Sequence, residues 1–75
     1  MILPEQITHK TFDNFRIRKL KKYIDLSREM GYNYNTFLVN LHNLKMGKSP
    51  AMLFRSRFAK YLNRNDITIE ELQDV

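Results

Sequence analysis

The chain of 75 residues is long enough for one domain with a thin core, and its lack of cysteine excludes disulfides, thiolate metal sites and a cysteine nucleophile. Two glycines leave no room for a glycine-rich phosphate loop, and no stretch approaches the ~20 apolar residues of a membrane span, so we expect a cytoplasmic protein. Residues 1–64 carry 13 basic and 4 acidic side chains, whereas residues 65–75 carry four acidic ones and no basic one. This uneven charge favours a polyanionic partner.

The first part of the chain is interpreted as an N-terminal arm, residues 1–10, followed by the folded domain, residues 11–75. Thr11 is predicted to cap a helix over residues 12–24, in which Ile17, Leu20 and Ile24 share one apolar stripe. The rest of this helix carries more basic side chains than local salt pairing can neutralise. We interpret them as facing phosphates; the alternative is an ordinary solvated helix face.

Two further helices follow. Residues 25–31 form a short helix, capped by Asp25, that buries Leu26 and Met30 and ends at Gly31, because glycine adopts the left-handed conformation without strain. Residues 35–46 form a longer helix. Its predicted apolar stripe consists of Phe37, Leu38, Leu41 and Leu44.

The outer face of this longer helix is unusual, because it is polar but almost uncharged. It presents Asn35, Thr36, Val39, His42 and Asn43. Solvated helix faces normally carry Glu and Lys, and Asn is a mediocre helix former. An Asn side chain can bond adenine through two hydrogen bonds, and Thr or Val methyls can pack on the methyl group of thymine. The pattern indicates a face that reads DNA bases.

The C-terminal part is predicted to contain two more helices. Gly47 ends the preceding helix, Ser49 caps the next and Pro50 occupies its first position. Residues 51–63 then form a helix whose core stripe consists of Ala51, Phe54, Phe58 and Leu62. A short last helix begins at Thr68, which with Glu71 forms a capping box. The expected fold is all-α, a compact bundle of about five short helices containing a helix-turn-helix.

Several motifs, in this order, resemble the phage-type Cro and repressor family of helix-turn-helix regulators. The helix-turn-helix matches at Leu26, Ser27, Met30, Gly31, Tyr32 and Phe37. Gly47-Lys48-Ser49-Pro50 resembles the family's exit from the recognition helix, and Phe58-Ala59-Lys60-Tyr61-Leu62-Asn63 and Ile69-Glu70-Glu71-Leu72 resemble its later helices. Tyr23 falls near the family's usual phosphate-binding Gln. Asn40 falls where an apolar residue is usual, so we expect a rotated helix with Leu41 buried instead.

The resemblance implies a lambda-repressor-like domain whose recognition helix, about residues 35–46, lies in the major groove of double-stranded DNA. The base-reading residues it implies are Asn33, Tyr34, Asn35, Thr36, Val39 and Asn43. The implied phosphate-binding residues are Arg18, Lys21, Lys22, Arg28, Lys45 and Lys48. Such domains usually act as two-fold homodimers, because one short helix reads few base pairs.

The sequence thus predicts a sequence-specific transcriptional regulator of phage or plasmid type, a repressor or a related component. One alternative is a small helical protein-binding module, an inhibitor or adaptor, on a helix-turn-helix-like scaffold. Another is non-specific nucleic-acid binding through the basic first helix. His9 and His42 are far apart in sequence, and no residues form a catalytic pattern, so we expect no metal, no cofactor and no enzymatic activity.

Overall fold

The computed structural model describes residues 1–50 and 52–73, with the backbone alone of Met52. Within these residues every regular element is helical and no strand occurs, which confirms the all-α class. In chain order the elements are the 3-10 helix η1 (Pro4–Gln6), α1 (His9–Arg18), α2 (Tyr23–Met30), α3 (Tyr34–Lys45), α4 (Met52–Arg64) and the 3-10 helix η2 (Glu70–Leu72). The described residues contain four α-helices rather than about five, because the predicted last helix is the single turn η2.

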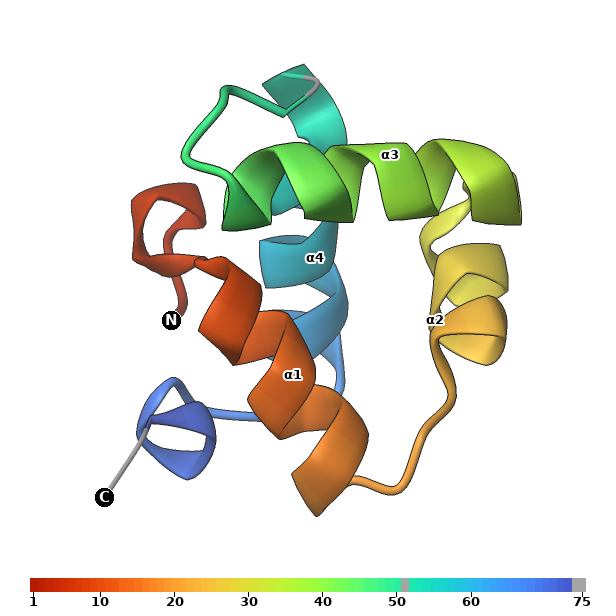
Figure 1. Ribbon diagram of the computed structural model, residues 1–75. Helices are drawn as coiled ribbons and strands as arrows, with labels where there is room; N and C mark the ends of the chain where they lie inside the picture. The colour runs from red at the N-terminus through yellow and green to blue at the C-terminus, as the bar shows by residue number, and fades with distance from the viewer. Residues whose placement is uncertain (51, 74–75) are drawn as a thin grey trace.

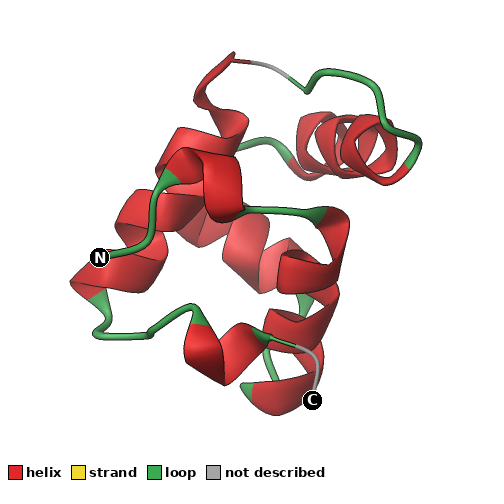
Figure 2. Cartoon of the chain, turned by 90° about the vertical axis from the view of Figure 1, so that its left-hand side faces the viewer, coloured by secondary structure: helices red, strands yellow, loops and turns green. Residues whose placement is uncertain are grey.

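The four α-helices surround one core (Figure 1). In this view α4 runs down the middle behind α1, α3 crosses above, and α2 stands at the right and leads up into α3. The two 3-10 turns close the remaining sides, η1 against α4 and η2 against α1. The radius of gyration is 11.2 Å, close to the ~11 Å expected for a compact chain of this length. Figure 2 shows the same arrangement turned by 90°.

Aromatic rings from three helices form the centre of the core. The ring of Phe12 in α1 stacks on Phe58 and Phe54 of α4, with centroids 3.9 and 5.0 Å apart, and meets the edge of Phe37 of α3 at 5.8 Å. Phe15 contacts Phe58 in a T-shaped pair at 5.6 Å. All five rings are buried. Offset and edge contacts of this kind add to the free energy gained by burying the rings.

The first helix differs from the prediction in both its bounds and its buried face. Helix α1 ends at Arg18, and Leu20 adopts a left-handed backbone conformation with φ of 53° before α2 begins at Tyr23. The predicted stripe is wrong: Ile17 is 60% exposed, Leu20 is 91% exposed and Ile24 is also exposed. The reason is rotational. Phe12 and Phe15 face the core, and Ile17 follows them by five and by two residues, respectively, which places it on the opposite side of the helix.

The first ten residues are packed more tightly than the predicted arm. Ile2 and Ile7 are buried in the core, and α1 already begins at His9. The side-chain amide of Asn63 accepts a hydrogen bond from the Ile2 N–H and donates one to the Ile2 carbonyl, which fastens the chain to α4. The cap of α1 is Thr8 rather than Thr11, which lies buried inside the helix and accepts from the Thr8 N–H at 3.0 Å.

The second and third helices agree with the predicted pattern except at four positions. Leu26, Met30, Phe37 and Leu44 are buried as predicted. Asn40 is only 5% exposed, whereas Leu41 is half-buried and Leu38 is exposed. The prediction that the helix is rotated so that Leu41 is buried in place of Asn40 is therefore wrong. Asn40 is tolerated inside because its Nδ2 donates to the Thr36 carbonyl, one turn earlier, at 2.9 Å. Asp25 lies within the first turn of α2, whose cap is Lys22.

The C-terminal elements follow the predicted core stripe. Phe54, Phe58 and Leu62 are fully buried on α4, while Ala51 lies outside the described residues. Residue 51 also borders the start of α4, so the predicted roles of Ser49 and Pro50 there remain predictions. In the last turn, half of the predicted capping box is present, because the Thr68 N–H donates to Glu71 Oε2 at 3.0 Å.

Two substitutions on α1 test which of its faces is buried. Phe12→Leu removes part of the central stack and should lower the free energy of unfolding by about 1–2 kcal/mol. Ile17→Ala changes a side chain directed to solvent and should alter it by less than about 0.5 kcal/mol. Urea unfolding followed by circular dichroism measures both. A larger loss for the Ile17 variant would contradict this fold and restore the helix predicted over 12–24.

Candidate nucleic-acid interface

Helices α2 and α3 are joined by a three-residue turn with a fixed geometry. Gly31 ends α2 with φ of 82°, and the N–H groups of Gly31 and Tyr32 donate to the carbonyls of Arg28 and Ser27 at 3.1 and 2.8 Å. Asn33 then caps α3, because its Oδ1 accepts from the Asn35 N–H at 2.8 Å. These capping hydrogen bonds, at the end of α2 and at the start of α3, fix the direction of α3 relative to α2.

The turn is also covered from outside. The guanidinium of Arg57 in α4 lies 4.9 Å from the centroid of the Tyr32 ring, a cation–π contact. Tyr32 in turn contacts Phe54 in a T-shaped pair at 5.5 Å. The turn that leads into α3 is thereby attached to the aromatic core.

The outward side of α3, which we call the α3 face, consists of Asn35, Thr36, Leu38, Val39 and His42. All five side chains are exposed, and none of the five is Asp, Glu, Lys or Arg. Because a helix repeats every 3.6 residues, Asn35, Val39 and His42 form a single ridge. The first charged side chain of α3 is Lys45, its last residue.

The six residues predicted to read bases are not equally available. Asn35, Thr36, Val39 and Tyr34 are exposed on the first two turns of α3. Asn33 is exposed, but its amide oxygen is already used as the cap of α3. Asn43 is half-buried. The structure therefore gathers four of the six on one end of the helix and leaves Asn43 near its edge.

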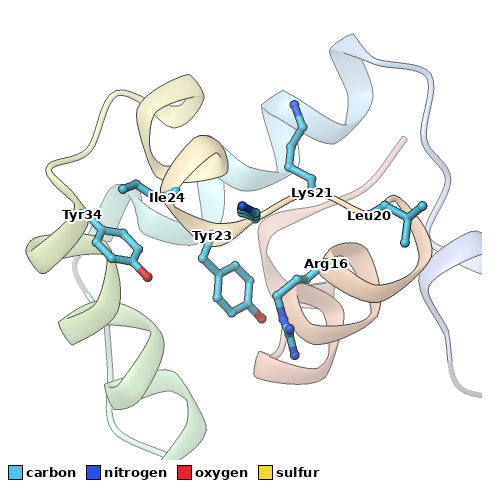
Figure 3. A pocket seen from close by; sticks show the side chains of 7 residues that line it. Arg16, Leu20, Lys21, Tyr23, Ile24 and Tyr34 are labelled. Carbon is cyan, nitrogen blue, oxygen red and sulfur yellow. The ribbon is translucent and has the colours of Figure 1, made fainter.

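Beside the first turn of α3 lies an open hollow of about 500 Å³, which we call the tyrosine groove (Figure 3). It is bordered by α1, the segment 20–22 and the first turns of α2 and α3. Figure 3 shows Tyr23 between Arg16 on one side and Tyr34 on the other. The side chains that line it are those of Arg16, Leu20, Lys21, Lys22, Tyr23, Ile24 and Tyr34.

Tyr23 holds the floor of this groove in place. Its hydroxyl donates to Asp13 Oδ1 in α1 at 2.6 Å, and its ring lies 5.6 Å from that of Phe37 in α3. The guanidinium of Arg16 lies over the same ring, 5.3 Å from its centroid. Burial raises the pKa of Tyr23, and the hydrogen bond to Asp13 adds to this. One side chain thus connects three helices, and its hydroxyl proton is held by Asp13.

The six predicted phosphate-binding residues separate into two groups. Arg18 donates to the Glu71 carbonyl at 2.5 Å, and Lys21 pairs with Glu29 at 2.5 Å. A hydrogen bond from Lys21 to Glu29 raises the pKa of Lys21. The other four side chains are exposed, and within the described residues no hydrogen bond or ion pair joins them to a carboxylate: Lys22, Arg28, Lys45 and Lys48.

Three of these four cations lie toward the ends of α3, whereas Arg28 lies in the last turn of α2. Lys22 and Tyr34, the first residue of α3, both line the tyrosine groove, while Lys45 ends the helix and Lys48 follows it. Arg16 also lines the tyrosine groove, although the sequence indicated it only as one of the many basic side chains of the predicted helix over residues 12–24. The groove forms next to Arg16 because α1 ends at Arg18 and the chain turns at Leu20. No residue pattern near these positions predicts the helix end or the turn.

No protein-family model, curated protein or solved structure matches this chain. In the described part of the chain, no helix is both long and apolar enough to cross a membrane, and no group of three or more His, Cys, Asp or Glu side chains could hold a metal ion. The side chains gathered here instead provide hydrogen-bonding amides and methyl groups in the middle and cations on either side.

The ionisation of Tyr23 provides a test of the groove. Because its pKa is raised above the ordinary value near 10, the folded protein keeps this proton at pH values where the unfolded chain loses it. The free energy of unfolding should therefore fall as the pH rises above ~10, and it should fall less steeply in Tyr23→Phe. Urea unfolding at several pH values measures the slope.

The control for this measurement is Tyr34→Phe, which removes an exposed hydroxyl from the opposite wall of the same groove. This variant should keep the slope of the native protein. Equal slopes in the native protein and in Tyr23→Phe would show that Tyr23 is not held by Asp13 as described.

Proposed function

We propose that this protein is a sequence-specific double-stranded DNA-binding regulator, of the kind found in phages and plasmids, in which α2 and α3 act as a helix-turn-helix. The observation that carries the proposal is the α3 face: an uncharged row of amide, hydroxyl and methyl groups with unpaired cations beyond both ends. The closed three-residue turn at Gly31 supports it, because a recognition helix must keep a fixed direction relative to the helix that braces it. The order of the Cro-like and repressor-like motifs in the sequence supports it as well.

In this proposal, residues in the first two turns of α3 contact the DNA bases. The major groove of B-DNA is about 12 Å wide and admits one helix. Asn35 is placed to bond the N6 and N7 edge of an adenine, because its side-chain amide offers a donor and an acceptor together. Thr36 and Val39 offer methyl groups for thymine, and Tyr34 lies at the edge of the same surface.

The cations that flank α3 contact the phosphates of the DNA backbone in this proposal. With 12 residues at ~1.5 Å each, α3 spans about 18 Å, which exceeds the groove width; Lys22 lines the tyrosine groove with the first residue of α3, and Lys45 and Lys48 lie at and after its last residue. This placement suits contacts with phosphates on both sides of a major groove. Such contacts set the register and the salt dependence of binding, while the α3 face sets the sequence.

The proposal includes a two-fold homodimer on the DNA. A single α3 reads only a few base pairs, which is too little to select one site in a genome. Two copies related by a two-fold axis would place their α3 helices in major grooves one helical turn apart, about 34 Å. The operator would then be a pseudo-palindrome.

A second candidate function uses the same face to bind a protein, as an inhibitor or adaptor. The observation that favours it is apolar exposure: Leu38, Val39 and Met46 are all exposed on or next to α3. Their side chains could pack on a partner protein as well as on thymine methyls. The experiments below separate the two, because a protein-binding face would show no preference among duplexes.

The α3 face is tested by selecting binding sites from a pool of random duplexes and measuring affinity for the selected sequence. Asn35→Ala should lower the discrimination between the selected site and a random duplex by about 5- to 150-fold, since one such side chain contributes about 1–3 kcal/mol. Asn43→Ala, a half-buried residue at the edge of the same helix, should lower it less. If selection yields no consensus sequence, the regulatory proposal is wrong.

The flanking cations are tested by the salt dependence of the same complex. Lys22→Ala removes one phosphate contact, so the slope of log K against log salt concentration should fall by about one while the preferred sequence stays unchanged. Lys60→Ala removes a similar charge from the far side of α4 and should leave the slope as it is. Equal effects of the two variants would indicate binding through total charge alone.

A further inference from the structure

A second hollow, unrelated to α3, lies between the start of the chain and α4. It measures about 450 Å³ and is lined by residues 1–4 and by α4 side chains between residues 56 and 64. We call it the N-terminal groove. Figure 2 shows the N-terminus on the left, whereas α3 is the helix seen end-on at the upper right, before the loop that leads to the grey residue 51. The two surfaces therefore lie on different sides of the molecule.

The walls of the N-terminal groove are fixed rather than formed by a loose end of the chain. Ile2 is buried beneath it, and both its N–H and its carbonyl are bonded to the side-chain amide of Asn63 at 2.8 and 3.0 Å. On α4, Ser56 and Ala59 face the groove, and their small side chains leave the space that larger residues would fill. The hollow is a feature of the packed fold.

The surroundings of the groove are apolar. Leu3 on one wall is 51% exposed, and Leu53, which precedes the groove on α4, is 53% exposed. Leu53, Ser56 and Lys60 share one face of α4, because they are three and seven residues apart. From Leu53 to Asn63 this face extends about 15 Å, or roughly three helical turns. Exposed leucines beside an apolar hollow are characteristic of a surface that another molecule covers.

The charge at the rim indicates what that molecule is. Lys60 and Arg64, one turn apart on α4, both line the groove and are exposed, and among the described residues no Asp or Glu lines it. A second copy related by a two-fold axis would bring an equally basic rim against the first, and the two rims would repel. A partner with acidic side chains beside an apolar stripe would satisfy both the charges and the hollow.

The backbone groups around the groove favour a helical partner over an extended one. A bound extended segment needs donors and acceptors for its own main chain. The walls offer it no strand edge, and the amide of Asn63 is already used on both its oxygen and its nitrogen by Ile2. An amphipathic helix satisfies its own main chain and needs only its apolar face covered.

We propose that the N-terminal groove binds an amphipathic helical segment of a partner protein, with apolar side chains between Leu3 and α4 and acidic side chains opposite Lys60 and Arg64. This binding activity is independent of the proposed DNA binding. Because the groove and the α3 face lie on different sides, a duplex and a protein partner can be bound at the same time.

The experiment uses a synthetic helical peptide of about 14 residues, with Leu on one face and Glu on the other, titrated into the ¹⁵N-labelled full chain. The amide signals of residues around Leu3, Ala59 and Lys60 should shift. The double variant Lys60→Glu with Arg64→Glu should weaken binding, measured by calorimetry, by at least about tenfold. Lys45→Glu with Lys48→Glu, the same charge change at the far end of α3, is the matched control and should bind like the native protein.

Leu53→Glu supplies a second variant that tests the apolar surface beside the groove and should also weaken peptide binding, and circular dichroism establishes that each variant is folded. Because all the substituted side chains are exposed, we expect native spectra. Three outcomes would overturn the proposal. They are shifts centred on α3 or the tyrosine groove, equal binding of a scrambled peptide of the same composition, and self-association in sedimentation experiments that Leu53→Glu abolishes, which would make a second copy the occupant.

Discussion

The stacking of Phe12 between two other helices is the interaction on which the rest of this structure depends. Its ring is the point where α1, α3 and α4 meet, with Phe58 at 3.9 Å and Phe54 at 5.0 Å on α4 and Phe37 on α3. A 75-residue chain buries only about 60% of the surface that its unfolded form exposes, so a few large rings contribute much of the burial. Once Phe12 and Phe15 face inward, Ile17 must face outward, and α1 has no apolar face on which to continue beyond Arg18.

The end of α1 in turn creates the candidate interface. Because the chain turns at Leu20, Tyr23 begins a new helix and its ring can lie against Phe37 while its hydroxyl reaches back to Asp13. This places Arg16, Lys22 and Tyr34, the first residue of α3, around the same groove. The tyrosine groove is thus a consequence of how the aromatic core is packed.

Folding also sorts the charges that are uneven along the sequence. The acidic C-terminal segment returns to the end of α1, where the Glu71 carbonyl accepts from Arg18 and its carboxylate lies 3.9 Å from Lys19. Asn14 holds the same turn by donating to the Leu72 carbonyl at 2.6 Å. Glu29 in the same manner forms an ion pair with Lys21. The cations without such partners in the described part of the chain include those at both ends of α3, and that arrangement is the basis of the functional proposal.

Local features of the sequence determined the fold class, the stop of α2 at Gly31, the body of α3 with its uncharged outer side, and the buried stripe of Phe54, Phe58 and Leu62 on α4. These depend on residues within one or two helical turns, where glycine conformation and apolar spacing act directly. Only the tertiary structure decided which face of α1 is buried, where it ends, which cations are paired and why Asn40 lies inside. Each of these depends on contacts between residues far apart in the sequence, as Phe12 with Phe58, Arg18 with Glu71 and Ile2 with Asn63 show. A helical repeat of apolar residues cannot reveal them, because Ile17, Leu20 and Ile24 form as regular a stripe as the phenylalanines that the core selects instead.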